Sequence, residues 1–516
     1  MVFCTNILPA AGLRSSNAIM GLFHLPRELR DLIYEFYVTQ REPLRYFPDD
    51  AKLRTCNGDA IDLNLTYVCK QAAVELSGML FRHNTIDFVA SLNDNPATVS
   101  RASRFHAMVH DLHQRRLELL NHCRPYITAE IIEDATIAFP YCTSLLPVLT
   151  SRRRSYPETP SKAKDWGTVP SEHRDLITYV LQQVQKQPGF PGFTHALGNL
   201  IKYPRFAKHA QHIDTLTHPV CQSWKVPTDT ELDQIEETVP GLRDVASDGS
   251  KRHRRCFSAA ALAADFLASL PRSLRIAVTE ISLHGKHIGA GYTECHAKAL
   301  IPFCIENLNM RIKRHVDLWQ NVLPGYHSNG YDFARQLDFY GVGRPIGMPR
   351  WVITETVALW IDEALALPVA GMPPGAFSLI FDGTLNNVQA VINVMKKDAA
   401  WQEALESCLR RQSIAPPTLG LDNCAAGHRG SPLHFSEDFP RKLSTVLAGD
   451  SFIGFSGVAS SEPLSRGSLV DENRTCTTHD AWIRKWRMLS LISFDPVEPF
   501  PSWEHIQRQY KMPRLV

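Results

Sequence analysis

The chain has little excess charge of either sign and lacks any long apolar run. Its 55 Lys and Arg residues nearly balance 53 Asp and Glu residues. This balance argues against a general electrostatic attraction to nucleic acid or to an anionic membrane. No apolar run approaches the roughly 20 residues that span a bilayer. The hydrophobic fraction of 44% and the charged fraction of 21% are typical of a folded soluble protein, so we expect no nucleic-acid or membrane partner.

The cysteines lack the spacing of a metal site or a redox motif. Twelve cysteines are scattered through the chain without a CxxC pair. Such a pattern is typical of reduced thiols, and it predicts a protein of the cytoplasm or nucleus. Residues 1–21 carry Arg14 as their one charged residue, and we expect them to form a flexible leader rather than a signal peptide.

Complete catalytic motifs are also lacking. The segment FSLIFDGTLNN is similar to the first motif of haloacid-dehalogenase-like phosphatases, in which two aspartates stand two residues apart. Here Asp382 matches the second aspartate, but Ile380 occupies the position of the nucleophile and cannot attack phosphorus. His106, His110 and His113 share one helical face, but no HExxH glutamate and no nearby cluster of cysteines completes a metal site. We therefore expect no catalytic residue, no metal and no cofactor.

What the sequence does contain is an amphipathic N-terminus. The segment FHLPRELRDLIYEFYV predicts a helix that begins near Leu25, with Pro26 in its first turn. Leu25, Leu29, Ile33 and Phe36 recur at helical spacing and form one apolar stripe. A second helix with its own stripe, which includes Val68 and Cys69, is expected within LNLTYVCKQAAVELSGMLFRHN, and a strand is expected at NTIDFV. The polar residues 39–62 are predicted to form a loop.

Changes of composition predict several units along the remaining chain. The stretch 150–170 is basic and rich in Pro and Ser, which favours an exposed linker. Lys251–Arg255, at the end of an acidic stretch, is expected to be solvated, and a nuclear-localisation signal is the alternative for both basic stretches. The predicted units are a leader (1–21), a helical unit (22–90), a helix–strand extension (91–149), the basic linker (150–170), a helical segment (171–226), a charged loop (227–256) and a C-terminal α/β body (257–516).

The C-terminal body is predicted to alternate helices with strands. We expect helices over 258–270, 294–322, 352–366 and 384–411, and strands over 276–283, 376–383 and 486–494; a further strand is expected at Asp134–Phe139. Strands separated by helices favour helices packed on a modest sheet. The predicted fold class is mixed α+β and α/β, with an N-terminal helical unit followed by a helix-rich body.

Two segments of the helical unit resemble the F-box-like region of filamentous-fungal proteins. Leu25, Pro26, Glu28, Leu29 and Ile33 match its LPxEL opening, and Leu65, Val68, Cys69 and Lys70 match a later VC[KR] stretch. The tail that runs through Asn84, Thr85 and Phe88 fits the fungal variety. Residues 294–322 also resemble a downstream stretch of such proteins, to which no chemistry is assigned.

The resemblance implies a protein-interaction function. An F-box unit docks on a Skp-type adaptor of a cullin–RING ubiquitin ligase while the rest of the chain recruits a substrate protein. This implies a non-enzymatic adaptor whose partner-binding residues are Leu25, Pro26, Leu29, Ile33, Val68 and Cys69. Two alternatives stay open. The first is a scaffold in which these residues are buried against the chain's own next domain. The second is an unrecognised enzyme in the C-terminal half, with a site around Asp382 or His284–His287.

Overall fold

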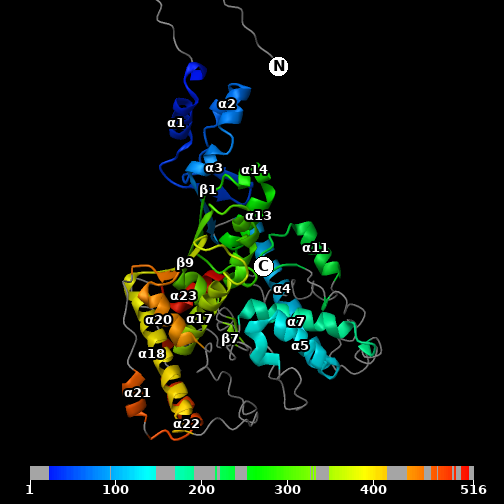
Figure 1. Cartoon of the computed structure of the whole chain (residues 1–516), viewed down its shortest axis with the longest axis vertical. Coiled ribbons are helices and arrows are strands. Elements are labelled where there is room, and N and C mark those ends of the chain that lie inside the picture. The colour runs from blue at the N-terminus through cyan, green and yellow to red at the C-terminus, as the bar shows by residue number, and fades with distance from the viewer. Residues whose placement is uncertain are drawn as a thin grey trace, which may run out of the picture.

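The fold is described from a computed structural model of the chain (Figure 1). The described residues are 22–92, 95–146, 169–190, 216–217, 221–238, 253–325, 327–328, 331–332, 348–414, 438–457, 466–473, 475–490, 493–494 and 501–510. The helices α1–α3 lie at one end of the molecule's long axis, and α18, α21 and α22 lie towards the other end (Figure 1). A central sheet lies between these two groups.

This sheet has seven strands in the order β10-β9-β5-β4-β3-β1-β2. All neighbouring strands are parallel except the edge pair formed by β1 and β2. From β1 onward, each later strand of the sheet is added on the same side of the one before, so the order never reverses. Right-handed connections of this kind place their helices on one face of the sheet. The strands are β1 (Leu44–Phe47), β2 (Lys52–Arg54), β3 (Thr85–Ala90), β4 (Glu280–Gly285), β5 (Arg311–Asp317), β9 (Phe377–Asp382) and β10 (Ile453–Phe455).

One face of the sheet, which we call the covered face, belongs to the hydrophobic core. In β3, for example, Ile86 and Phe88 are fully buried, whereas the residues between them are partly accessible. The same period of two appears in β4, β5 and β9. The covered face consists of Leu44, Tyr46, Leu53, Ile86, Phe88, Ala90, Ile281, Leu283, Gly285, Ile312, Arg314, Val316, Phe377, Leu379, Phe381, Ile453 and Phe455.

The opposite face, which we call the open face, carries polar and charged side chains that water reaches. Lys313 is 55% exposed and Asp382 is 37% exposed, although both lie on interior strands of the sheet. The open face consists of Arg45, Phe47, Lys52, Arg54, Thr85, Asp87, Val89, Glu280, Ser282, His284, Arg311, Lys313, His315, Asp317, Ser378, Ile380, Asp382 and Gly454.

Helices from the connections that follow β3 contribute to the core on the covered side. Helix α13 (Ala259–Ser269) begins at Ser258, whose hydroxyl accepts a hydrogen bond from the Ala261 N–H, and it lies against β3 and β4. Further helices of this region include α4 (Pro96–Cys123), α5 (Ala129–Ala138), α7 (Pro170–Gln185), α11 (Asp229–Thr238), α14 (Arg272–Arg275), η8 (Thr293–Leu300), α15 (Ile301–Glu306), α17 (Arg350–Ala366), α18 (Leu385–Arg410), α20 (Phe439–Ala448), α21 (Arg466–Glu472), α22 (His479–Ser490) and α23 (Trp503–Tyr510).

The N-terminal helices have a small core of their own. They are α1 (Arg27–Val38), α2 (Lys70–Glu75) and α3 (Met79–His83), and the turn η2 (Asn64–Tyr67) precedes α2. Their buried apolar side chains form a cluster separate from the main core, made of Tyr34, Val38, Ala72, Leu76 and Met79. This separate cluster is consistent with a distinct helical unit at one end of the molecule.

Short-range contacts fix this helical unit to the sheet. The buried Asn84 amide donates to the carbonyls of Val38 and Leu80, and its oxygen accepts from the Gln40 N–H, so it joins the ends of α1 and α3. Gly78 has φ +76, and a Cβ on it would lie 2.9 Å from the Cβ of Ala277 in the body. Glycine therefore permits both the left-handed turn and the close approach.

The described residues confirm the mixed fold class and correct several predicted elements. Residues 39–62 are not only loop, because β1 and β2 lie within them. Asp134–Phe139 was predicted as a strand but lies almost wholly in α5. Residues 294–322 were predicted as helix, yet they contain β5, an interior strand of the sheet. Most of 486–494 is the end of α22, followed by the two-residue strand β11 (Ser493–Phe494), which pairs with β8 (Met348–Pro349).

The predicted unit boundaries need two corrections. Strands β1 and β3 of 22–90 belong to the same sheet as β4 of the C-terminal body, so residue 90 is not a domain boundary. Within the charged loop 227–256, α11 forms a helix, and His253 and Arg255 of the basic stretch are buried. The leader 1–21 and almost all of the basic linker 150–170 lie outside the described residues.

Candidate interaction surfaces

Helix α1 exposes an apolar stripe on the side that faces away from its own core. Leu29 is 47% exposed, Ile33 is 40% exposed and Phe36 is 85% exposed, and Leu32 lies between them. The spacing of these four residues is i, i+3, i+4 and i+7, so they share one face of the helix. The opposite face carries Arg30, Tyr34 and Val38, which are buried. The sequence correctly predicted the stripe, but the stripe does not form the core.

The six predicted partner-binding residues are at least partly accessible. Pro26, Leu29, Ile33 and Val68 are exposed, and Leu25 and Cys69 are half-buried. Cys69 has a local role, because its Sγ accepts the Ala72 N–H and so caps α2. The scaffold alternative requires this stripe to be buried against the chain itself, and the described residues show Leu29 and Ile33 exposed instead.

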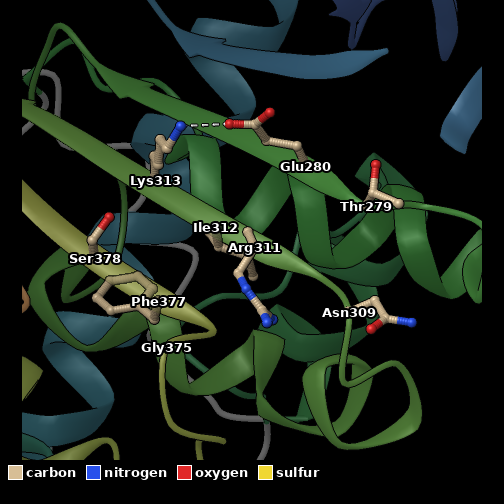
Figure 2. Close-up of a pocket in the computed structure, with 9 residues that line it drawn as sticks. All are labelled: Thr279, Glu280, Asn309, Arg311, Ile312, Lys313, Gly375, Phe377 and Ser378. Atoms are coloured by element: carbon tan, nitrogen blue, oxygen red, sulfur yellow. Dashed lines mark hydrogen bonds and ion pairs between the residues drawn. The ribbon is translucent and has the colours of Figure 1, made fainter. Parts of the chain in front are cut away.

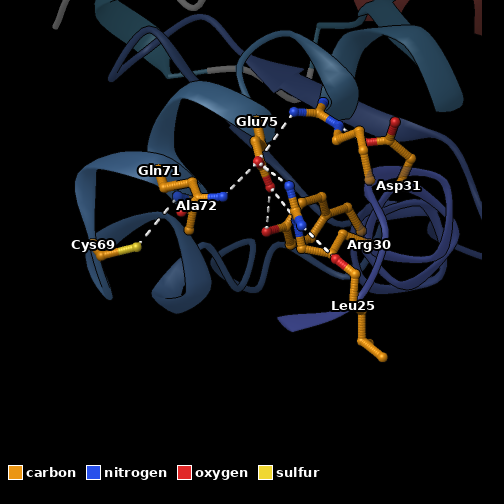
Figure 3. A network of polar contacts seen from close by, with 9 residues as sticks. Leu25, Arg30, Asp31, Cys69, Gln71, Ala72 and Glu75 are labelled. Atoms are coloured by element: carbon orange, nitrogen blue, oxygen red, sulfur yellow. Dashed lines mark hydrogen bonds and ion pairs between the residues drawn. The ribbon is translucent and has the colours of Figure 1, made fainter. Parts of the chain in front are cut away.

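The inward side of α1 is fixed by a buried ion pair (Figure 3). The Arg30 guanidinium donates Nε and Nη2 to the two carboxylate oxygens of Glu75, at 3.0 and 2.7 Å. The hydroxyl of Tyr34 and the amide of Gln71 also donate to Glu75. The hydrogen bond from Arg30 lowers the pKa of Glu75 to about 2. Because this pair orients α1 against α2, it determines that the leucine and isoleucine side chains face solvent.

The open face of the sheet is the second candidate surface. The Lys313 ammonium lies 2.6 Å from the Glu280 carboxylate on the adjacent strand, which lowers the pKa of Glu280. Figure 2 shows these two side chains reaching towards each other, whereas Arg311 points away from them. Among the described residues, Arg311 Nη1 donates to the carbonyls of Leu308 and Met310 alone. Cross-strand ion pairs therefore neutralise part of the charge on this face, and not all of it.

Two histidines lie side by side at the middle of the open face. The rings of His284 and His315 are stacked, with centroids 5.3 Å apart. His315 Nδ1 lies 3.1 Å from Asp382, and His284 Nε2 lies 3.7 Å from Asp87 and 2.8 Å from the Ser282 hydroxyl. Each imidazole thus has a polar partner that orients it on the sheet.

Two of the hollows on the described part of the chain adjoin the sheet. The first, of about 380 Å³, lies at the amino ends of β5 and β9 and includes Arg311, Lys313 and Ser378 in its wall (Figure 2). The second, of about 320 Å³, lies beside the edge strand β10 and is lined largely by apolar residues, among them Leu447 and Phe452. The walls of both hollows are formed by residues other than the two stacked histidines and Asp382.

The structure brings together only some of the residues around which an enzyme site was considered. Asp382, His315 and His284 are neighbours on the open face, but His287 lies apart, 6.4 Å from the Tyr510 ring between centroids, and burial lowers its pKa to about 4. The part of the chain that the structure describes contains no group of three or more His, Cys, Asp or Glu residues with the geometry of a metal site. None of the described helices has the length and apolar character needed to cross a membrane.

Comparison with known proteins gives no relative. No protein-family model, curated protein or solved structure matches the chain.

Sequence reasoning missed a large part of the open face because it missed strands β1, β2 and β5. In RIKRHVD, Ile312 and Val316 alternate with Lys313 and His315, which is the pattern of a half-buried strand. The buried Arg314 interrupts this alternation and conceals the strand. The alternation typical of a strand was therefore present in β5, but recognising it required accepting an arginine at a buried position.

Proposed function

We propose that this chain is a non-enzymatic adaptor whose N-terminal helical unit docks on a Skp-type adaptor protein of a cullin–RING ubiquitin ligase. The observation that carries the proposal is the exposed stripe of Leu29, Leu32, Ile33 and Phe36. Four large apolar side chains on one helical face gain free energy when a partner removes them from water. Their opposite face already packs on its own core, so the stripe is available to a second protein.

The close packing of the helical unit against the body supports the same function. Asn84, which directly precedes β3, joins the ends of α1 and α3, and Gly78 packs closely against Ala277 of the body. An adaptor needs close packing of this kind, because it has to hold a recruited protein at a defined position relative to the ligase. The open face of the sheet would then serve as the surface that recruits a substrate protein.

Binding of the full-length chain to a purified Skp-type adaptor, measured by calorimetry, tests the proposal. We expect Leu29→Arg combined with Ile33→Arg to abolish binding and leave the thermal midpoint nearly unchanged, because both side chains are exposed. Ile137→Arg is the matched control, since Ile137 is an exposed apolar residue of a different helix, α5. The proposal is wrong if the wild-type chain does not bind the adaptor, or if the double variant binds as the control does.

A further inference from the structure

We infer that the apolar stripe of α1 docks on a protein surface that is apolar at its centre and carries Lys or Arg side chains at its rim. The inference rests on the proposed function, because it concerns the same stripe, and it specifies the charge of the partner. Its basis is the set of carboxylates that border the stripe of Leu29, Leu32, Ile33 and Phe36.

One side of the stripe is bordered by acidic residues of α1 itself. Successive residues of an α-helix are rotated by about 100°, so Glu28, Asp31 and Glu35 fall within an arc of about 60°. The same rotation places this arc next to Leu32. Glu28 and Glu35 are both exposed and stand two turns apart, about 10 Å along the helix axis. This separation equals that of the first and last residues of the stripe.

The other side of the stripe has a carboxylate as well. On that side, Ile33 is followed around the helix by Tyr37, whose hydroxyl donates to the Asp62 carboxylate at 2.9 Å. Asp62 is exposed, and it forms no ion pair with the described part of the chain. Carboxylates therefore border the stripe on both sides.

The two arginines of α1 are occupied by other carboxylates. Arg30 is buried and binds Glu75. Arg27 lies 2.6 Å from Asp31 and 3.3 Å from Glu75, so its charge is shared between two carboxylates. Helix α1 and Glu75 together hold four carboxylates against two guanidiniums, which leaves two negative charges.

Glu28 and Glu35 are the two carboxylates left over. Glu28 forms no ion pair with any residue that the structure describes. Glu35 lies 3.5 Å from His83 Nδ1, but an imidazole carries charge only when it is protonated. Lys70 of α2 and Arg82 of α3 are exposed cations, and neither forms an ion pair with these two glutamates. The charge beside the stripe is therefore negative, and it complements a basic rim.

The same carboxylates argue against other occupants of the stripe. A helix that lies on an anionic membrane carries Lys and Arg beside its apolar face, which is the reverse of α1. Nucleic acid would bring further negative charge to the same place. A second copy of the chain would present the same carboxylates on both sides of its own stripe, so like charges would meet. A protein surface with a basic rim gains both the apolar contact and the ion pairs.

Fluorescence anisotropy with the full-length chain tests the inference. The probes are two labelled helical peptides that share one leucine face and carry either Lys or Glu beside that face. We expect the Lys-flanked peptide to bind roughly tenfold more tightly than the Glu-flanked peptide, and more weakly as salt is raised. Leu29→Arg combined with Ile33→Arg should abolish binding of the Lys-flanked peptide, because the apolar stripe is lost.

Charge reversal beside the stripe provides the matched comparison. We expect Glu28→Lys combined with Glu35→Lys to remove the preference for the Lys-flanked peptide. Glu133→Lys combined with Asp134→Lys makes the same change of charge near the exposed Ile137 of α5, and this control should keep the preference. Equal binding of the two peptides by the wild-type chain, or equal effects of the two double variants, would overturn the inference.

Two further measurements address the other occupants. One is binding to phosphatidylserine vesicles, and the other is sedimentation of the chain alone. Tighter binding to the vesicles than to the Lys-flanked peptide would overturn the inference, and so would a dimer that Leu29→Arg combined with Ile33→Arg dissociates. We expect neither result.

The same proteins separate this inference from the proposed function, because binding of the Skp-type adaptor is measured independently of the peptides. A preference for the Lys-flanked peptide without adaptor binding would reject the proposed function alone. Adaptor binding without a preference between the two peptides would reject the basic-rim inference alone.

Discussion

The two faces of the central sheet are built from the same strands but have opposite chemistry. The covered face packs Ile86, Phe88 and Phe381 among helices, whereas the open face presents ion pairs and hydroxyls to water. Two adjacent residues of one strand therefore differ more in burial and polarity than two residues of the same face on distant strands. The covered face therefore stabilises the fold. Substitutions on the open face are expected to affect binding and to leave the fold largely intact.

The largest contrast is expected at the neighbours Phe88 and Val89. Phe88→Ala removes a fully buried ring from the covered face and should lower the free energy of unfolding by about 3–5 kcal/mol. Val89→Ala, on the half-buried open face, should cost about 1 kcal/mol or less. Chemical denaturation of both variants measures the two losses in the free energy of unfolding, and equal losses would refute the distinction between the faces.

A second contrast compares two neighbouring cations. Arg314, which points into the covered side, donates to the Thr293 carbonyl at 2.5 Å and lies over the Trp360 ring. Arg314→Ala leaves a buried acceptor without its donor, which should cost about 1–3 kcal/mol. Lys313→Ala breaks an accessible ion pair and should cost about 0–1 kcal/mol. Thermal and denaturant unfolding provide the measurement, and a larger loss for Lys313→Ala would contradict the assignment of the two faces.

Glu363 on the covered side and Glu280 on the open face should change the stability of the fold in opposite directions as pH varies. Burial raises the pKa of Glu363 in α17 to about 7, although Arg174 and Lys298 partly oppose the shift. The folded chain then holds a proton that the unfolded chain has lost, so this group should destabilise the fold by about 3 kcal/mol as pH rises from about 4.5 to 7. Glu280 has a lowered pKa, so its contribution is present above its unfolded pKa and is lost as pH falls.

Glu363→Gln and Glu280→Gln test this opposition. Unfolding curves between pH 4 and 8 should show a smaller loss of stability with rising pH for Glu363→Gln than for the wild type. Glu280→Gln should instead reduce the loss of stability on acidification. If both substitutions changed the pH dependence of the free energy of unfolding in the same direction, this account of the two carboxyl groups would be wrong.

The smallest effect is expected on α1, which repeats the division into two faces within one helix. Leu29→Ala changes an exposed side chain and should alter the free energy of unfolding by no more than about 0.5 kcal/mol. Leu76→Ala, in the small core beneath α1, should cost about 2–5 kcal/mol. Denaturant titration distinguishes the two, and a large loss for Leu29→Ala would mean that the stripe supports the fold.

The sequence predicted elements with strong periodicity and missed those in which charge breaks the pattern. The helices α13, α17 and α18 and the strand β9 were expected close to their observed bounds, because their apolar spacing is regular. Strand β5 was missed because Arg314 occupies a buried position, and β1 was missed because its four residues lie in a polar stretch with two prolines. The apolar stripe of α1 was predicted, but local spacing cannot reveal which side of a helix faces solvent.

The shared sheet sets an order of events during synthesis. Thr85 of β3 pairs with Glu280 of β4, and their side chains are hydrogen-bonded across a separation of 195 residues. At roughly 5–20 residues per second, β3 leaves the ribosome roughly 10–40 s before the strand that covers its edge. During that interval, its unpaired N–H and C=O groups can template pairing with another chain. A nascent N-terminal fragment should therefore need chaperone protection until β4 emerges.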